Sequence, residues 1–324
     1  MNLTESNAAG SAHARRAGPE VVCTGIAVLD AVFRVAQFPV PEAKTQASEF
    51  MIISGGCAAN AAVAIARLGG RARFAGPLGG PAGEEAIGDR IIAALIGEHV
   101  DCAWCPRVPG VASSMSAICV DPRGERAIVN YRDDRLAAAR PSDPAAIVAT
   151  AVAVLADNRF PEFALPICAA ARARGIPVVL DADKPTRVTD ILLGTASHVV
   201  FSAEGLRATA GTHDLGMGLE RIAAASRSFL AVTDGANGVL WLEPGTPGKT
   251  RRMPAFPVEP IDTLAAGDVF HGAFVLALAE GRAEADAIRF AAAAAAIKCT
   301  RFGGITGAPA RAEVAAFLAA GHEA

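Results

Sequence analysis

Residues 262–274 read Asp-Thr-Leu-Ala-Ala-Gly-Asp-Val-Phe-His-Gly-Ala-Phe, a turn of small side chains that ends in an acid and continues as an apolar helix. The first turn of a helix offers backbone N–H groups without a partner inside the helix, and its dipole is positive there. Both properties attract phosphate, and small side chains let the backbone approach an anion closely. A carboxylate beside this cradle, here Asp268, can accept the proton of a hydroxyl group while a phosphoryl group is transferred. An ordinary helix start with acidic residues explains the segment equally well.

A second segment, residues 54–70, reads Ser-Gly-Gly-Cys-Ala-Ala-Asn-Ala-Ala-Val-Ala-Ile-Ala-Arg-Leu-Gly-Gly. The pair Gly55 and Gly56 would let backbone amides meet a ligand, and Asn60 can donate and accept hydrogen bonds toward hydroxyl groups. Gly69 suits the C-terminus of a helix, where a left-handed residue is favoured. Taken alone, the segment is more simply interpreted as a helix that packs tightly against a sheet.

Together and in this order, the two segments resemble the two signatures of the ribokinase-like (PfkB-type) carbohydrate kinases. Residues 55–69 resemble Gly-Gly-x-x-x-Asn-x-Ala-x-x-x-x-Arg-Leu-Gly, and residues 262–268 resemble Asp-Thr-x-Gly-Ala-Gly-Asp. The second segment departs at Ala265, where the family usually has Gly. At positive φ the methyl group of Ala265 would cost strain, whereas at negative φ it would be harmless.

The resemblance implies an ATP-dependent sugar kinase in which Asp268 accepts the proton of the attacking hydroxyl. The amides of Ala266, Gly267 and Asp268, in the turn that also contains Ala265, would hold the γ-phosphoryl charge, helped by Mg²⁺. The sugar hydroxyls would meet a second set of residues: Asp30, Gly55, Gly56 and Asn60. Asp30 follows an expected strand, so a turn residue or a helix cap is the alternative interpretation.

Residues 233–238 read Thr-Asp-Gly-Ala-Asn-Gly after an expected strand and resemble the family's Thr-x-Gly-x-x-Gly turn at the ATP phosphates. The resemblance implies that Thr233, Gly235 and Gly238 contact the nucleotide, although a plain hairpin turn explains the same residues.

Residues 201–204, Phe-Ser-Ala-Glu, resemble the family's Asn-x-x-Glu region near magnesium, with Phe201 in place of Asn. This similarity implies that Ser202 lies near the nucleotide and that Glu204 is an indirect magnesium ligand; a solvated glutamate at a helix start is the alternative. Further along, Lys298 and Arg301 complement the dipole at the end of an expected helix. The resemblance implies contacts to the nucleotide and to a monovalent cation such as K⁺ near this end, without fixing which residues make them.

The local sequences of residues 130–135, 157–162 and 295–304 resemble the ketohexokinase and sulfofructose kinase branch more than ribokinase itself. This implies a ketohexose-type acceptor, including sulfofructose, whose sulfonate or phosphate would be bound by Arg132, Arg135 and Arg159. Surface salt bridges with Asp133 and Asp134 are the alternative role of these arginines. Other acceptors, a different small sugar or a nucleoside, stay open, as does a sugar-binding regulator of the same fold that lost catalysis.

Strands and helices alternate along most of the chain, which is typical of a mostly parallel sheet covered on both faces. Strands are expected at 21–28, 71–76, 152–156, 178–181, 198–202, 229–233 and 239–242, and helices at 57–68, 83–97, 161–174, 188–193, 216–226, 267–280 and 284–301. With the resemblance, this predicts a ribokinase-like three-layer α/β/α sandwich. The β-rich segments 31–53 and 112–132 interrupt the alternation and are expected to form a small second sheet. In the resembled family such a sheet is a lid over the sugar and pairs two subunits, which implies a homodimer.

Composition sets the remaining expectations. Of the 324 residues 52% are hydrophobic and 19% charged, which is ample for a large core, and the net charge of −3 gives no basic field for nucleic acid. No apolar run is long enough for a membrane span, and residues 1–19 lack the apolar core of a signal peptide. The seven cysteines are scattered, as expected of free thiols in a reducing compartment. We therefore expect a cytoplasmic protein without nucleic-acid or membrane partners, with a disordered tail at 1–19 and one kinase domain at 20–320.

Overall fold

The computed structural model describes residues 18–188, 190–243, 245–246 and 248–321. The tail expected at 1–19 therefore lies outside the described residues except for Gly18 and Pro19. The Pro19 carbonyl accepts a hydrogen bond from the backbone N–H of Arg71 (2.9 Å), which places the start of the described chain against the edge of the central sheet.

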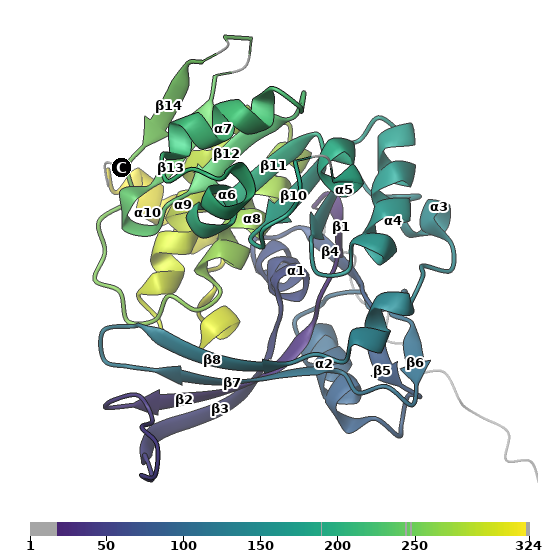
Figure 1. Cartoon of the computed structure of the whole chain (residues 1–324), viewed down its shortest axis with the longest axis vertical. Coiled ribbons are helices and arrows are strands. Elements are labelled where there is room, and N and C mark those ends of the chain that lie inside the picture. Colours follow the sequence, from purple (N-terminus) through teal and green to yellow (C-terminus); the bar gives the residue numbers. More distant parts are fainter. Residues whose placement is uncertain (1–17, 189, 244, 247, 322–324) are drawn as a thin grey trace, which may run out of the picture.

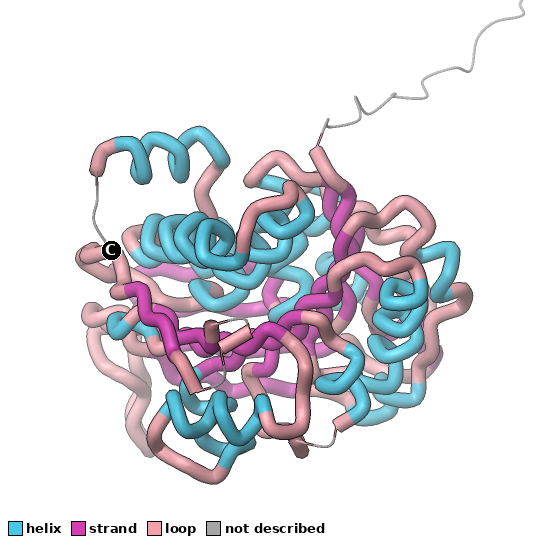
Figure 2. Tube along the Cα trace, turned by 90° about the horizontal axis from the view of Figure 1, so that it is seen from above, coloured by secondary structure: helices cyan, strands magenta, loops and turns pink. Residues whose placement is uncertain are grey.

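An eight-stranded sheet runs through the middle of the molecule (Figures 1 and 2). Its strands, in spatial order, are β4 (Arg71–Ala75), β1 (Glu20–Thr24), β9 (Ala153–Asp157), β10 (Val178–Ala182), β11 (His198–Ser202), β12 (Phe229–Thr233), β13 (Val239–Leu242) and β14 (Thr250–Met253). The strands from β4 to β12 are parallel, and β13 and β14 add an antiparallel hairpin at one edge. The central strands are nearly continuous apolar runs because both faces of a parallel sheet are buried.

Helices cover both faces of this sheet, as Figure 2 shows. One layer comprises α1 (Cys57–Arg67), α2 (Ala86–Gly97), α8 (Ala266–Ala279), α9 (Glu284–Cys299) and α10 (Arg311–Ala319). The other comprises α3 (Pro144–Ile147), α4 (Pro161–Ala173), α5 (Ile191–Thr195), α6 (Ala203–Ala210) and α7 (Leu215–Ala223). Successive residues of β1 pack into opposite layers, with Val21 and Cys23 in the first core and Val22 in the second. The expected three-layer α/β/α class is confirmed.

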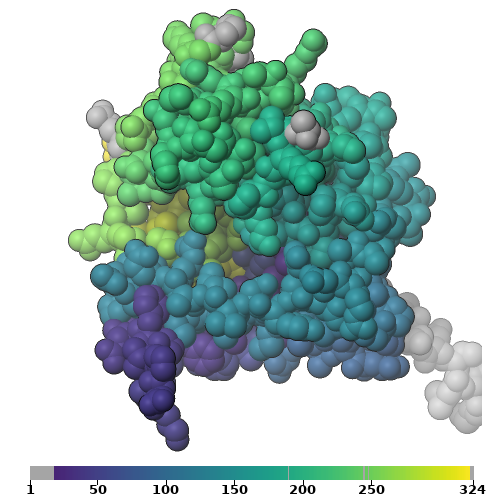
Figure 3. Space-filling view, in the orientation of Figure 1, coloured from purple at the N-terminus to yellow at the C-terminus, as the bar shows by residue number. Residues whose placement is uncertain are grey.

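A separate four-stranded sheet, which we call the lid, is built from the two expected β-rich segments. Its strands, in spatial order, are β3 (Ala47–Gly55), β2 (Val28–Val35), β7 (Ser114–Val120) and β8 (Arg126–Tyr131). Figure 1 shows the lid across one end of the α/β body, and Figure 3 shows a hollow between the two, with C-terminal residues in yellow at its floor. The inner face of the lid packs Val32, Ile53 and Ile118 against Leu264 and Phe302, so the lid rests on the turn that precedes α8.

The remaining elements are short. They are a two-stranded parallel sheet of β5 (Leu78–Gly80) and β6 (Arg107–Pro109), and the single 3₁₀ turns η1 (Asp134–Ala138), η2 (Gly235–Asn237) and η3 (Gly304–Gly307). Within the described ranges, no helix is long and apolar enough to cross a membrane.

The sequence interpretation was wrong about residues 21–28, expected as one strand: β1 of the central sheet ends at Thr24, and Val28 begins β2 of the lid. The chain leaves the central sheet at Gly25, where φ is 150° and a side chain would overlap the Asp157 carboxylate. The elements that were not expected include α6, α10 and β14. In these segments few side chains are buried; α10 buries only Val314 and β14 is mostly exposed. Hydrophobic periodicity therefore gives little signal there.

Candidate active site

The turn before α8 has the geometry of an anion cradle. Ala265 is the N-cap of α8 in the left-handed conformation (φ 63°, ψ 10°), so its methyl group costs about 1–2 kcal/mol of strain. No side chain among the described residues caps the helix, and the space beside Gly267 is open. The Ala266 amide donates to the Thr263 carbonyl at 3.2 Å, so the amides of Gly267 and Asp268, with the positive end of the helix dipole, are left for a ligand.

Asp268 lies in the first turn of α8 and is linked to the Gly55–Gly56 segment. The Asn60 Nδ2 group donates a hydrogen bond of 2.6 Å to Asp268 Oδ2, across 208 residues of sequence. Desolvation raises the pKa of Asp268 to about 6, although the Asn60 hydrogen bond opposes this rise. A carboxyl group with this pKa is mainly ionised at neutral pH and well matched to accept a proton.

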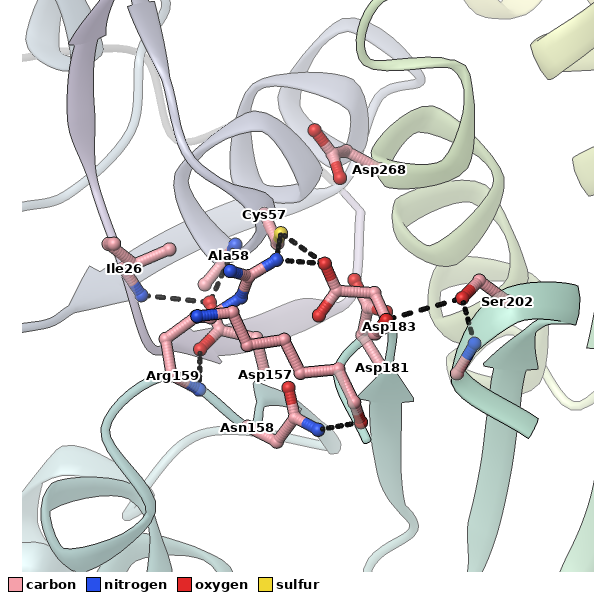
Figure 4. A network of polar contacts seen from close by, with 12 residues as sticks. Ile26, Cys57, Ala58, Asp157, Asn158, Arg159, Asp181, Asp183, Ser202 and Asp268 are labelled. Atoms are coloured by element: carbon pink, nitrogen blue, oxygen red, sulfur yellow. Dashed lines mark hydrogen bonds and ion pairs between the residues drawn. The ribbon is translucent and has the colours of Figure 1, made fainter. Parts of the chain in front are cut away.

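Three more carboxylates lie close to Asp268, at the carboxyl ends of two neighbouring parallel strands (Figure 4). Asp157 ends β9, and Asp181 and Asp183 lie at and just after the end of β10; the register pairs Asp157 with Asp181. Potential ligand atoms of Cys57, Asp181 and Asp268 lie within 4.8 Å of one another. Carboxyl ends of parallel strands are where α/β sheets bind ligands, so this cluster extends the site from the cradle onto the sheet.

Arg159 is the cation of the carboxylate cluster. Its guanidinium forms an ion pair with Asp183, and Nη2 lies 4.0 Å from the Cys57 sulfur (Figure 4). Asp157 is held by backbone amides, accepting from Ile26 at 2.8 Å and from Ala58 at 3.2 Å. Burial raises the pKa of Asp157 to about 6, and desolvation together with neighbouring carboxylates raises the pKa of Asp181. Burial also raises the pKa of the Cys57 thiol, so this cysteine is not a reactive thiolate.

The donor set suits a divalent cation. Oδ1 of Asp181 and Oδ1 of Asp183 are buried and have no hydrogen-bond partner in the described part of the chain. Unpartnered carboxylate oxygens are the ligands that Mg²⁺ prefers, so the residues present fit the expected magnesium ion. His271, one turn along α8, donates through Nδ1 to the Gly267 carbonyl at 2.7 Å and lies 3.4 Å from Asp181 Oδ2. Burial lowers the pKa of His271, and the position of its ring between Gly267 and Asp181 links Asp181 to the cradle.

The expected sugar-binding residues gather next to Asp268. Asp30 lies within β2 of the lid, so the alternatives of a turn residue or a helix cap are excluded. Burial raises the pKa of Asp30 to about 6, opposed by a hydrogen bond with Ser116. A side chain at Gly55 would overlap the Asp30 carboxylate, and Gly56 caps α1 with φ 93°. The two glycines therefore allow the lid and α1 to approach closely, with Asn60 bridging to Asp268.

The expected nucleotide residues lie at the carboxyl ends of the next two strands, β11 and β12. Ser202 caps α6 by accepting from the Gly205 amide at 3.0 Å, and its hydroxyl donates to the Asp183 carbonyl at 3.3 Å. The Thr233 hydroxyl donates to the Phe201 carbonyl at 3.3 Å, so Thr233 and Ser202 are adjacent. Phe201 is fully buried in the core, where it has no access to a ligand.

Residues 233–238 also form the turn between β12 and β13, as the plain hairpin interpretation expected. Gly235 opens η2, and Gly238 has φ 88° where a side chain would overlap the Met253 carbonyl. Glu204 is exposed in the first turn of α6 and borders a surface hollow shared with Arg207 and His213. The magnesium and nucleotide roles of these residues stay predictions.

Two of the three candidate arginines are adjacent, since Arg132 Nη1 donates to the Arg159 carbonyl at 3.4 Å. The Arg159 side chain lies in the carboxylate cluster, whereas Arg132 stacks over the Phe160 ring at 5.6 Å and lies 3.6 Å from Asp134. Arg135 pairs with Asp133 at 2.7 Å, and 67% of its side chain is exposed. The surface salt bridges that the sequence offered as an alternative are thus present for both Arg132 and Arg135.

Sequence reasoning missed Cys57, Asp181, Asp183 and His271. One signal was available for the aspartates, since Asp-Ala-Asp follows the buried run Val178–Leu180 directly. Carboxylates at the end of a buried parallel strand are candidates for a ligand site. Cys57 and His271 carry no such signal, because each lies within a segment that is otherwise apolar helix.

Comparisons with known proteins agree with this geometry. Residues 19–311 match the family described as pfkB family carbohydrate kinase. A ribokinase of Haemophilus influenzae is 30% identical over 307 residues, which cover 89% of this chain and 95% of the relative. Fructokinase-1 of Zea mays is 28% identical over 329 residues, with coverage of 92% and 97%. A solved structure from Agrobacterium tumefaciens, provisionally named a ribokinase, is 39% identical with a TM-score of 0.89 and coverage of 95% and 100%. The chain therefore belongs to the pfkB family of carbohydrate kinases and is an ATP-dependent sugar kinase.

Proposed function

We propose that this kinase transfers the γ-phosphoryl group of ATP to a hydroxyl of a neutral ketohexose-type sugar such as fructose. The observation that carries the proposal is the 2.6 Å hydrogen bond between Asn60 and Asp268. It joins the glycine pair under the lid to the carboxylate beside the anion cradle. A hydroxyl bound between the two would have a proton acceptor on one side and the phosphoryl cradle on the other.

In this proposal Asp268 accepts the proton of the attacking hydroxyl through Oδ1, since Oδ2 is engaged by Asn60. The amides of Gly267 and Asp268 stabilise the charge of the transferring group, next to the Ala266 amide that is bonded to Thr263. Asp181 and Asp183 would hold Mg²⁺, which neutralises phosphate charge when bound. Ser202, Thr233, Gly235 and Gly238 would contact the nucleotide, with Glu204 acting through water.

The residues on the lid side of the site would orient the sugar. Asp30 is the buried carboxylate nearest to the glycine pair, and carboxylates accept hydrogen bonds from sugar hydroxyls. Gly55 and Gly56 supply backbone groups at close range, and the unpartnered, buried Oδ1 of Asn60 supplies a further acceptor. The lid covers this side, which would limit access of water to the phosphoryl group.

The charge pattern favours a neutral acceptor over sulfofructose or a sugar phosphate. Each candidate anion-binding arginine already has a carboxylate partner: Arg159 with Asp183, Arg132 with Asp134 and Arg135 with Asp133. A sulfonate would have to displace Asp183 from Arg159 and would then face the remaining carboxylates of the cluster. Relatives named ribokinase and fructokinase support neutral sugars, and ribose is the second candidate acceptor.

We further propose a homodimer that pairs through the outer face of the lid. This face exposes large apolar side chains on β3 and β8, namely Phe50 and Ile52 on β3 and Val129 and Tyr131 on β8. A contiguous exposed apolar face on a sheet is typical of a protein interface.

The test is an ADP-release assay of the purified protein with Mg²⁺ and ATP. The panel contains fructose, other ketohexoses, ribose, sulfofructose, fructose phosphates and nucleosides. We expect the highest kcat/KM with a neutral ketohexose. A higher value for sulfofructose would overturn the neutral acceptor, and a higher value for ribose would favour the second candidate. Sugar binding by calorimetry without ADP release from any member would instead indicate a non-catalytic regulator.

A further inference from the structure

A buried lysine lies directly behind the anion cradle. Lys298 is in the last turn of α9, and its side chain is fully buried. Its Nζ donates to the Asp262 carbonyl at 2.7 Å and to the Arg301 carbonyl at 3.4 Å, and it lies 3.1 Å from Asp262 Oδ2. The ammonium group is therefore surrounded by oxygen atoms and shielded from solvent. A buried charge is tolerated only when it is paired in this way.

Asp262, the partner of Lys298, is the first residue of the phosphate-binding turn. Its Oδ2 also accepts from the amides of Gly303 (3.0 Å) and Gly304 (2.8 Å), and its Oδ1 accepts from the Leu264 amide (2.8 Å). One buried carboxylate thus fixes the turn to the loop after α9. The negative charge at this position is balanced by Lys298. Burial lowers the pKa of Lys298, and the neighbouring Asp262 opposes this decrease.

This region is where the family resemblance implies a monovalent cation, and the residues present do not fit one. Carbonyl and carboxylate oxygens are suitable K⁺ ligands, but here Asp262 and Arg301 direct theirs at an ammonium group. An ammonium ion carries the same single charge as K⁺ and is of similar size. A second cation beside it would meet like-charge repulsion in a space without solvent.

We propose that the ammonium group of Lys298 is a built-in monovalent cation that holds the turn 262–267 in its phosphate-binding conformation and makes this kinase independent of K⁺. Lys298 is a positioning residue, since it acts on the reaction through Asp262 and the turn that leads to Asp268. A lysine that merely satisfies carbonyls at a helix C-terminus would explain the contact to Arg301. It would not explain why the shortest contact is to Asp262, 36 residues earlier.

The first experiment uses the wild-type protein. ADP release and the thermal unfolding midpoint are measured in KCl, NaCl and tetramethylammonium chloride at equal ionic strength. We expect the same rate and the same midpoint in all three salts. Activation by K⁺ of about tenfold or more, which corresponds to about 1.4 kcal/mol, would overturn the proposal. The unfolding measurement needs no acceptor sugar, so a wrong choice of acceptor does not affect this result.

The second experiment replaces the ammonium group. Lys298→Ala leaves space at the oxygen atoms, and misplacement of the turn should lower the rate by about 10²-fold in tetramethylammonium chloride. K⁺ or NH₄⁺ should restore most of this loss and raise the unfolding midpoint. Lys298→Met fills the same space without charge, so it should be impaired and should not respond to K⁺. Lys249→Ala removes an exposed lysine and is the charge-matched control, expected to behave as wild type.

Two results with the variants would refute the idea. Full activity of Lys298→Met in any salt would show that the charge is not needed. A folded but impaired Lys298→Ala that K⁺ and NH₄⁺ leave unchanged would show that the lysine is structural only. If Lys298→Ala does not fold in any salt, the salt response of the wild type and the activity of Lys298→Met decide the question.

Discussion

Replacement of the Asp268 carboxylate by an amide tests the centre of the proposed mechanism. In Asp268→Asn the amide oxygen can still accept the 2.6 Å hydrogen bond from Asn60, so the link between α1 and α8 is retained. What disappears is the group that takes the proton. The phosphoryl-transfer rate should then fall by about 10²- to 10⁴-fold, the usual contribution of a positioned general base. Dissociation constants for sugar and ATP should change little.

The pH profile gives this prediction a second, independent readout. Because the pKa of Asp268 is raised to about 6, the wild-type kcat should fall as the pH drops through about 6, where the carboxylate becomes protonated. At neutral pH roughly ten ionised carboxylates exist for each protonated one, so the rate should have levelled off. In Asp268→Asn the residual rate should lack this dependence.

Asp30 provides the control, because its pKa is also raised to about 6. Asp30→Asn should raise KM for the sugar while the kcat of this variant still falls below pH 6. Initial rates of ADP release at saturating ATP, measured from pH 5 to pH 8, separate the two cases. Near-normal turnover in Asp268→Asn, or a retained pH dependence in its residual rate, would remove Asp268 from its assigned role.

Three further changes test neighbouring parts of the argument. Ala265→Gly relieves a strain of about 1–2 kcal/mol in the left-handed conformation, at an entropic cost of about 0.4–1 kcal/mol. The midpoint of urea unfolding should therefore rise slightly while activity is retained. A lower midpoint would contradict the strain. Gly55→Ala places a methyl group against the Asp30 carboxylate. It should lower kcat/KM for the sugar by about 10²-fold and leave KM for ATP unchanged. Equal losses for both substrates would argue against a position of Gly55 at the sugar. Val129→Glu charges a side chain that is 75% exposed on the lid and should convert the dimer to a monomer in light scattering, whereas Ile191→Glu on α5, 70% exposed, should not. A monomeric wild type would remove the dimer proposal.

The sequence predicted those parts of the site whose functional residues lie within a few positions of one another. The turn 262–268 and the glycine pair at 55–56 combine small residues, a helix start and a polar side chain within a few positions, so each is visible without knowing the fold. Their contact through Asn60 and Asp268 joins residues 208 positions apart and depends on the packing of α1 against α8. Only the resemblance to a family brought the two segments together in advance.

The conformation of Ala265 was left undecided for a related reason. An alanine in a turn of small residues is compatible with either sign of φ, and only its place as the N-cap of α8 selects the positive one. The sequence likewise did not show that the chain leaves the central sheet at Gly25. The run 21–28 is continuously apolar or small, and nothing in it marks the point where the chain passes from the central sheet into the lid. The break is imposed by Asp157, which belongs to another strand and accepts from the amide of Ile26.

Charged residues show most clearly what sequence reasoning lacks, because the partner decides the role. Arg132, Arg135 and Arg159 were equivalent candidates, and the structure separates them by their carboxylate partners. Arg132 and Arg135 each pair with an aspartate two residues away, whereas Arg159 reaches across 24 residues to Asp183. Lys298 was expected to complement a helix dipole, and it does lie in the last turn of α9. The sequence did not indicate that this lysine is buried against Asp262. An isolated ammonium in a dry interior would be costly, so its presence beside the phosphate-binding turn requires a function that a neutral side chain does not supply. An ammonium group that is covalently attached to the chain, in place of an exchangeable K⁺ ion, meets this requirement. The salt dependence of the wild-type activity tests it most directly.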